Sequence, residues 1–195
     1  MINLKKISIA ISEQQDVSAK YFSEHYDYSK YLDRGQSDIN NMKRQNYEGK
    51  KVEFAVYNWF KSNGWDITEV DVNIYPPNEK SFAQDLKSRE RHFQIKSQSK
   101  ASAEMWGTSF IFQYGNIFGK DKTGDKDGHA FDNIHSKDGV IFALIDNRDI
   151  TIIARTNIET LHKHSLFKEP KKRDLLGVKK AVYLEDLEKI VNGHI

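Results

Sequence analysis

The sequence predicts an α/β protein in which helices flank a β-sheet of mixed strand direction. Apolar residues recur at helical spacing after residue 49, and several later segments alternate apolar with polar residues. A continuous apolar run from Val140 to Ile145 is typical of a strand that is buried on both faces. The length of 195 residues suits one core, so we expect an N-terminal accessory helical segment (1–47) and one domain (48–195).

The composition excludes several classes of protein. Cysteine is absent, which excludes disulfide scaffolds, thiol nucleophiles and zinc held by cysteine. No segment reads as a membrane span or an export signal, so we expect a cytoplasmic protein that does not contact a membrane. Thirty Lys and Arg against 28 Asp and Glu give a formal net charge of +2, so any contact with nucleic acid must be local.

Two helices are predicted in the first third of the chain. Ser12 is placed to cap a helix that runs to about Tyr26. Its apolar face is expected to carry Val17, Tyr21 and Phe22. A second helix is predicted from Gly49, where a clear helical pattern begins, to Asn63-Gly64, where it ends. Its apolar stripe consists of Val52, Ala55, Val56, Trp59 and Phe60.

The strands are predicted from alternation and from turn residues. A strand over 67–75 is followed by a hairpin with arms 81–86 and 92–97 around the charged turn 87–91. The later part of the chain is expected to hold the following elements: a helix within 101–118, a long loop over 119–139, a hairpin with arms 140–146 and 150–155, a helix over 157–164 that Thr156 and Glu159 cap, a strand at 181–183 and a helix over 185–191.

The first hairpin carries residues suited to phosphodiester hydrolysis. That reaction needs a divalent cation held by oxygen ligands, together with a nearby cationic group. Asp85 ends the first arm, and Gln94 and Lys96 lie two residues apart on the second. Because side chains alternate along a strand, Gln94, Lys96 and Gln98 are expected on one face, opposite Phe93 and Ile95. Closing the hairpin is expected to bring Asp85 beside Gln94 and Lys96.

The spacing of Asp85, eight intervening residues and Gln94-Ile95-Lys96 resembles the core motif of the PD-(D/E)xK nuclease superfamily. This superfamily includes many type II restriction endonucleases, archaeal Holliday junction resolvases and repair nucleases. The stretch from Gly49 to Glu53 resembles the start of the family's first helix, whose glutamate completes the metal site. The resemblance covers roughly 48–155 and implies a restriction-endonuclease-like mixed sheet in the order helix, three strands, helix, two strands.

The resemblance also implies a role for each site residue. Asp85, Gln94, the backbone carbonyl of Ile95 and Glu53 would hold Mg²⁺, with Mn²⁺ as a substitute, and Lys96 would orient the attacking water. Two positions depart from the family pattern. Gln84 replaces the usual proline, and Gln94 stands where most members have Asp or Glu. Glu48 is an alternative to Glu53, and Asp71 is an alternative to Asp85.

The expected function is that of a divalent-metal-dependent endonuclease of duplex DNA, and a homodimeric type II restriction endonuclease is preferred. A structure-selective Holliday junction resolvase or repair nuclease is the alternative, and a non-cleaving nucleic-acid-binding module is the alternative from another class. The basic run over 168–180 and Trp106 are further candidates for contacts with nucleic acid. The residues expected to contact DNA are Gln98, Lys100, Lys87, Arg89, Lys120 and Lys122. His129, Asn133 and His135 suggest a His-Asn-His nuclease only weakly, because their spacing is too short.

Overall fold

The structure is a computed structural model of the chain, and it describes residues 1–28, 38–75, 85–89, 91–113, 137–177 and 179–193. Its strands are β1 (Ile7–Ile9), β2 (Leu86–Ser88), β3 (Arg91–Ser99), β4 (Ser109–Gln113), β5 (Gly139–Asp146), β6 (Asp149–Asn157) and β7 (Lys179–Tyr183). Its helices are α1 (Glu13–His25), α3 (Ile39–Ser62), α4 (Lys100–Trp106), α5 (Ile158–Lys163) and α6 (Leu184–Val191), with a short 3₁₀ helix over Arg173–Leu175.

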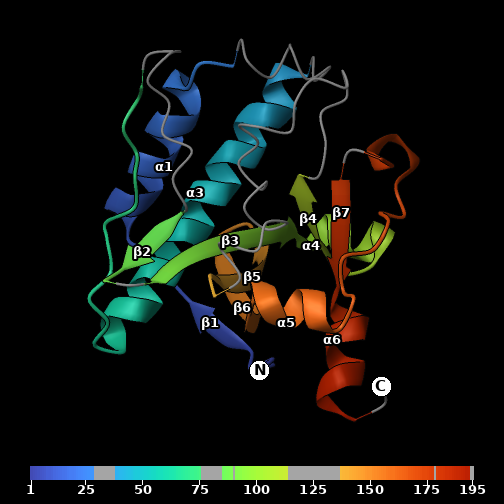
Figure 1. Cartoon of the computed structure of the whole chain (residues 1–195). Helices are drawn as coiled ribbons and strands as arrows, with labels where there is room; N and C mark the ends of the chain where they lie inside the picture. Colours follow the sequence, from blue (N-terminus) through green and yellow to red (C-terminus); the bar gives the residue numbers. More distant parts are fainter. Residues whose placement is uncertain (29–37, 76–84, 90, 114–136, 178, 194–195) are drawn as a thin grey trace.

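The main sheet is mixed, as expected for an α/β protein. Its strand order is β1-β6-β5-β3-β2; β3 and β5 run parallel, and the other neighbouring strands run antiparallel. Strands β4 and β7 form a second, two-stranded antiparallel sheet. The long helix α3 lies across the main sheet beside α1, and β4, β7, α5 and α6 lie away from these two helices (Figure 1).

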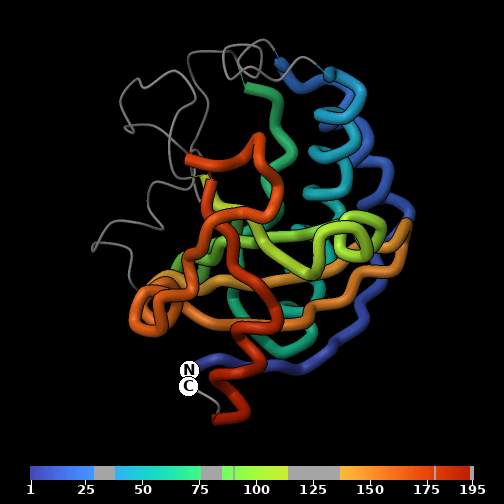
Figure 2. Tube along the Cα trace, turned by 90° about the vertical axis from the view of Figure 1, so that its right-hand side faces the viewer, coloured from blue at the N-terminus to red at the C-terminus, as the bar shows by residue number. Residues whose placement is uncertain are grey.

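Two apolar cores occupy the two faces of the main sheet. The core on the α3 face includes Val52, Phe60 and Phe93, and the core on the other face includes Phe112 and Phe142. Strand β5 contributes to both cores, since its side chains alternate between them, which confirms the expectation of a strand buried on both faces. Figure 2 shows from the side that α1 and α3, in blue to teal, pack against each other.

Helix α1 has the expected cap but not the expected apolar face. The side chain of Ser12 accepts a hydrogen bond from the backbone N–H of Gln15, and the Gln15 side chain bonds the Ser12 N–H in return. The prediction that Val17 and Tyr21 face the core is wrong, because both side chains are exposed. The buried residues of α1 are Ala19, Phe22 and Ser23.

Helix α3 begins ten residues earlier than its apolar stripe indicated. Asp38 caps it by accepting a hydrogen bond from Asn41 N at 3.0 Å, and Met42 is already buried. The expected boundary between residues 47 and 48 therefore lies inside this helix. Residues before that boundary also join the main sheet, because β1 pairs with β6.

The prediction of a strand over 67–75 is wrong. The structure forms a single bridge there, between Ile67 and Ser88. Ile67 and Val70 are buried three residues apart, which is not the period of a strand. The carboxylate of Asp71 accepts a hydrogen bond from Asn73 N at 3.0 Å, so it supports a turn in place of an extended ladder.

Both predicted hairpins are present, with different bounds for the first one. Strand β2 has three residues, so Asp85 comes directly before this arm and does not end it. The expected residues 81–84 of that arm lie outside the described residues. The second hairpin, β5 and β6, turns at Asn147-Arg148 as expected.

The helix expected within 101–118 is α4, and β4 follows it without having been predicted. Helix α5 is also confirmed, but its cap is wrong: the side chain of Asn157, not Thr156, accepts from Thr160 N at 2.8 Å. Strand β7 and helix α6 confirm the predicted ending of the chain. Residues 119–136 of the predicted loop, including Lys120, Lys122 and His129, lie outside the described residues. No helix in the described part of the chain is long and apolar enough to cross a membrane.

Candidate active site

The two faces of β3 differ in the way the sequence predicted. Phe93 belongs to the core on the α3 face, where its ring centroid lies 4.7 Å from that of Phe60. Ile95 packs against the same core. On the opposite face, the ammonium of Lys96 lies 4.8 Å from the ring centroid of Phe112 of β4. The site is therefore built on a strand that is anchored on one face by aromatic packing.

Asp85 is fixed to the middle of β3. Leu86 pairs with Phe93, so Asp85 and Gln94 are the next positions along the hairpin. In place of a continued ladder, the Asp85 carboxylate accepts a hydrogen bond from the backbone N–H of Ile95 at 2.8 Å. This bond brings the Asp85 carboxylate to the edge of the Gln94-Ile95-Lys96 stretch, as the closed hairpin was expected to do.

Gln94 is buried without satisfied hydrogen bonds. The residue is 4% exposed, and neither its amide oxygen nor its amide nitrogen has a hydrogen-bond partner among the described residues. Leaving a buried polar group unpaired costs about 1–3 kcal/mol. An apolar side chain of similar size would avoid that cost, so the Gln94 amide is a candidate ligand group.

Glu53 is buried on α3 and forms an ion pair with Lys50, with 2.6 Å between Lys50 Nζ and Glu53 Oε2. Glu53 precedes Phe60 by seven residues, so both project from one side of the helix. At about 1.5 Å per helical residue it lies about 10 Å before Phe60, a span that three residues of β3 cover.

Helix α3 and strand β3 run antiparallel. Phe60 near the end of α3 touches Phe93 near the start of β3, and Glu48 lines a groove together with Ser97 and Ser99. Glu53, seven residues before Phe60 on the same helix, lies on the α3 face of the sheet. Gln94 and Lys96 lie on the opposite face, so the structure brings Asp85 to the edge of β3 but does not place Glu53 on the face that carries Gln94 and Lys96.

The two alternative carboxylates differ in position. Glu48 is half-buried, and burial raises the pKa of its carboxyl against the opposing effects of Arg44 and Lys51. Asp71 accepts hydrogen bonds from Asn73 N and from the Tyr75 hydroxyl, both at 3.0 Å, within its own turn. Glu48 thus stays beside the site as an alternative to Glu53, whereas Asp71 supports a local turn.

The donor set suits a hard cation but carries little charge. A Mg²⁺ ion prefers oxygen ligands, and Asp85, Glu53, the Gln94 amide and the Ile95 carbonyl all offer them. The unpartnered Gln94 amide fits such a role. However, no cluster of three or more His, Asp or Glu suited to a metal ion occurs within the described ranges. Two carboxylates and neutral oxygens predict weak metal affinity.

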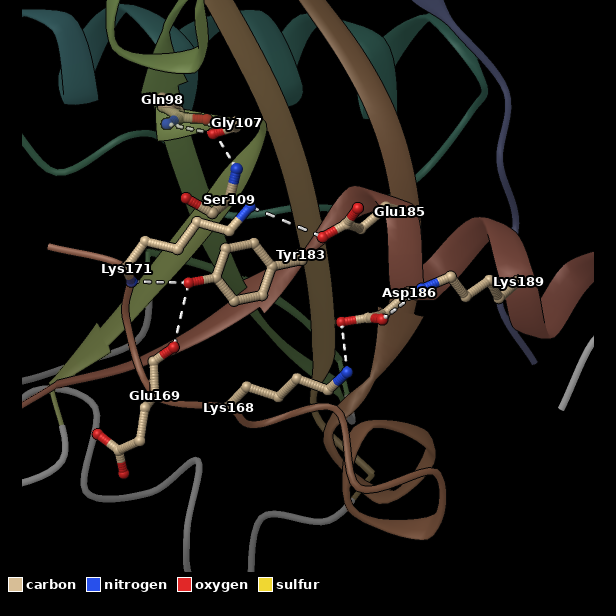
Figure 3. Close-up of polar contacts among 10 residues, drawn as sticks. All are labelled: Gln98, Gly107, Ser109, Lys168, Glu169, Lys171, Tyr183, Glu185, Asp186 and Lys189. Carbon is tan, nitrogen blue, oxygen red and sulfur yellow. Dashed lines mark hydrogen bonds and ion pairs between the residues drawn. The ribbon is translucent and has the colours of Figure 1, made fainter. Parts of the chain in front are cut away.

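The residues expected to contact DNA have contacts within the chain. The amide of Gln98 donates to the carbonyl of Gly107 at 3.1 Å and accepts from Ser109 N at 2.8 Å, which ties down the turn between α4 and β4 (Figure 3). Lys100 pairs with Asp146 at 3.0 Å, and Arg89 pairs with Asp66 at 3.3 Å.

These ion pairs leave the cations accessible. The side chains of Lys100 and Arg89 are 58% and 85% exposed. Ion pairs in water contribute about 0–1 kcal/mol, so an incoming phosphate can replace the carboxylates. Lys87 is also exposed. The amide of Gln98, in contrast, is already hydrogen-bonded to the turn between α4 and β4.

A groove of about 730 Å³ lies at the end of β3, and no pattern in the sequence predicted it. The groove is bounded by the first half of α3, the end of β3, α4, β4, β7 and the segment 170–175. It includes Trp106 and part of the basic run over 168–180, which are the two features that pointed toward nucleic acid. What the sequence could not show is that they share one surface.

Comparison of the chain with protein-family models, with curated proteins and with solved structures found no match. A functional assignment therefore depends on the residues and contacts described above.

Proposed function

We propose that this chain is a divalent-metal-dependent endonuclease that hydrolyses phosphodiester bonds of DNA. The observation that supports this most is the hydrogen bond of 2.8 Å from Ile95 N to the Asp85 carboxylate. It holds a carboxylate next to the backbone of the Gln-x-Lys stretch. The second support is the buried amide of Gln94 on the same strand, which has no hydrogen-bond partner in the part of the chain that the structure describes.

The order of elements supports a restriction-endonuclease-like fold in part. Helix α3, strands β2 and β3, helix α4 and strands β5 and β6 follow part of the order that the resemblance implies, with the bridge at Ile67 in the place of the first strand and β4 inserted before β5. The structure differs from the order that the resemblance implies in two ways. The first strand is reduced to one bridge, and the strands β1, β4 and β7 are additional. A homodimeric type II restriction endonuclease and a structure-selective resolvase or repair nuclease are both compatible with this order.

The chain's own residues have distinct tasks in this proposal. Bound Mg²⁺ would supply charge neutralisation at the phosphate and an activated water. Asp85 and Glu53 provide the negative charge that binds the ion, and Gln94 adds a neutral oxygen. The ammonium of Lys96, held over the Phe112 ring, stabilises negative charge that develops on the phosphate oxygens.

A non-cleaving nucleic-acid-binding module is the second candidate. It is favoured by the uncharged Gln94 and by the lack of a third clustered acidic or histidine ligand in the ranges that the structure describes. In that case the chain keeps its fold and its surface for nucleic acid but does not hold a cation tightly enough for hydrolysis.

Cleavage of supercoiled plasmid with Mg²⁺ or Mn²⁺ tests the proposal. We expect nicked and linear products with the wild type, and a loss of about 100-fold or more in Asp85→Asn and in Lys96→Met. Lys20→Met is the matched control, because Lys20 is a well-exposed lysine on α1, away from β3. Equal digestion by wild type and both site variants contradicts the assignment, and no digestion by the wild type favours the binding module.

A further inference from the structure

The groove beside the candidate site begins one residue beyond Lys96. The last residues of β3, Ser97 to Ser99, form part of its lining, and Glu48 of α3 lines it five residues before Glu53. From there it extends between the first half of α3 and the segment 170–175, with Trp106 of α4 inside it. A chain-like ligand in this groove therefore lies beside the end of β3 that follows Lys96.

The lining of the groove is polar and almost neutral. Its four cations are Arg44, Lys171, Lys172 and Lys179, and its three carboxylates are Asp38, Glu48 and Asp174. Some of these charges are paired, since Lys172 lies 2.8 Å from Asp174 and Lys171 lies 3.8 Å from Glu185. Uncharged serine, asparagine and glutamine side chains complete the polar lining.

Both walls next to Trp106 are held in place by specific contacts. The Tyr183 hydroxyl accepts a hydrogen bond from Lys171 N at 2.9 Å and donates one to the carbonyl of Glu169 at 3.1 Å. Gln98 fixes the turn after α4, as described above, and Figure 3 shows these contacts around Tyr183 and Gln98. The groove is therefore formed before a ligand binds, which lowers the entropy cost of binding.

We propose that this groove binds an unpaired, single-stranded stretch of nucleic acid. One base stacks on the indole of Trp106, and the neighbouring phosphates lie against Lys171 and Lys172. Trp106 is 40% exposed, so part of its indole is open to solvent. Base stacking on an aromatic side chain contributes without sequence preference, because every base has a flat face.

Three properties favour an unpaired strand over a duplex. The bases of a duplex are stacked on each other, so their faces are not open to Trp106. A single strand carries about half the charge per length of a duplex, so the few cations of this groove, on a chain with a net charge of +2, suit a single strand better. A volume of about 730 Å³ is the size of a pocket for a small ligand, which suits a few nucleotides.

If the groove binds a single strand, it restricts the kind of DNA that the proposed nuclease cleaves. Because the groove lies at the end of β3 that follows Lys96, cleavage is expected at DNA with an unpaired stretch, such as a flap or an opened junction. This preference rests on the proposed function, and it favours the structure-selective alternative over a restriction endonuclease. Binding of a single strand does not rest on it.

The test measures binding without metal. Fluorescence anisotropy with a labelled 12-nucleotide single strand and with the matching duplex, in EDTA, gives both affinities for the wild type. We expect the single strand to bind at least tenfold more tightly. Trp106→Leu is expected to weaken this binding by about tenfold, the size of one lost stack. Replacing Lys171 and Lys172 by methionine should make the affinity for the single strand depend less steeply on salt concentration.

Trp65→Leu is the matched control, because Trp65 is also 40% exposed but packs against Phe60 and Phe93. Thermal melts show whether each variant is folded. Equal or tighter binding of the duplex overturns the inference, as does equal weakening by Trp106→Leu and Trp65→Leu in folded proteins. Plasmid cleavage in Mg²⁺ is measured separately. Single-strand binding without cleavage overturns the proposed function but supports the proposed binding groove. Cleavage without a preference for the single strand supports the proposed function but overturns the proposed binding groove.

Discussion

Lys51 on α3 and Gln94 on β3 are buried to the same extent but differ in how they are satisfied. Lys51 is 2% exposed and Gln94 is 4% exposed. The ammonium of Lys51 donates to the carbonyl of Asn147, lies 3.7 Å from the Asp16 carboxylate and sits 4.9 Å from the Tyr47 ring centroid. The amide of Gln94 has no partner among the described residues.

The difference separates a structural polar group from a candidate ligand. Lys51 connects α1, α3 and the turn between β5 and β6, so its contacts hold three elements together. The Gln94 side chain makes no hydrogen bond to any residue that the structure describes, and its burial lowers the stability of the fold. If Gln94 serves a ligand, replacing each residue by an apolar one should have opposite effects on the free energy of unfolding.

Lys51→Met is expected to have the largest effect. It removes the buried cation beside Asp16, which keeps the Tyr47 hydroxyl and Arg148, and it removes the donor of the Asn147 carbonyl; losing hydrogen bonds from a charged group typically costs about 1.5–3 kcal/mol. Urea unfolding of wild type and variant measures the difference. Lys20→Met, whose side chain is 67% exposed, should stay within about 0.5 kcal/mol of the wild type. A loss for Lys51→Met as small as that of the control would mean that the network does not stabilise the fold.

Gln94→Met is expected to increase the free energy of unfolding by about 1 kcal/mol, because it removes an unpaired buried amide while keeping the volume. It should also abolish plasmid cleavage. Gln98→Met is the matched control on the same strand: it loses the bonds to Gly107 and Ser109, so it should be destabilised. Denaturation in EDTA measures both. Destabilisation of Gln94→Met by as much as Gln98→Met would show that the Gln94 amide is satisfied within the protein.

Tyr47→Phe is expected to have the smallest effect and a distinct pH dependence. The Tyr47 hydroxyl donates to Asp16 Oδ1 at 2.6 Å, and burial, followed by this hydrogen bond, raises the pKa of Tyr47 to about 12. Because the unfolded pKa is about 10, the contribution of Tyr47 is complete below pH 10 and disappears as the pH rises to about 12. The variant should lose about 1 kcal/mol at pH 7.

Comparing wild type with Tyr47→Phe across this pH range removes the contribution of the other tyrosines and lysines. The difference between the two unfolding free energies should be constant up to pH 10 and should shrink above it. A difference that stays constant to pH 12 would contradict the role of the Asp16 bond.

The parts of the fold that local patterns determine were predictable. The cap at Ser12, the strands around Asn147-Arg148 and the alternation of Phe93 and Gln94 follow from turn chemistry and period. Strand β1 was missed because three residues carry too little pattern, and its pairing with β6 is a contact between distant segments. The 67–75 stretch was misread because Asp71 makes a turn that apolar alternation does not reveal.

The site was predictable in its residue types and less so in its geometry. The spacing of Asp85 and Lys96 suggested a hairpin that brings the first beside β3, and the bond from Ile95 N agrees with this. The sequence could not show that Gln94 is buried, that Glu53 pairs with Lys50, or that Gln98 is committed to a turn. These properties depend on contacts of β3 with β4 and α3, which form only when the chain folds.

Binding of Mn²⁺ in the absence of DNA tests the central proposal most directly. Titration of wild type, Asp85→Asn and Gln94→Glu, followed by electron paramagnetic resonance of free Mn²⁺, gives the three affinities without any cleavage. We predict weak saturable binding to the wild type, at least tenfold weaker binding to Asp85→Asn, and tighter binding to Gln94→Glu because the added carboxylate supplies the missing charge. Equal Mn²⁺ affinity of wild type and Asp85→Asn would contradict a metal site at this edge of β3.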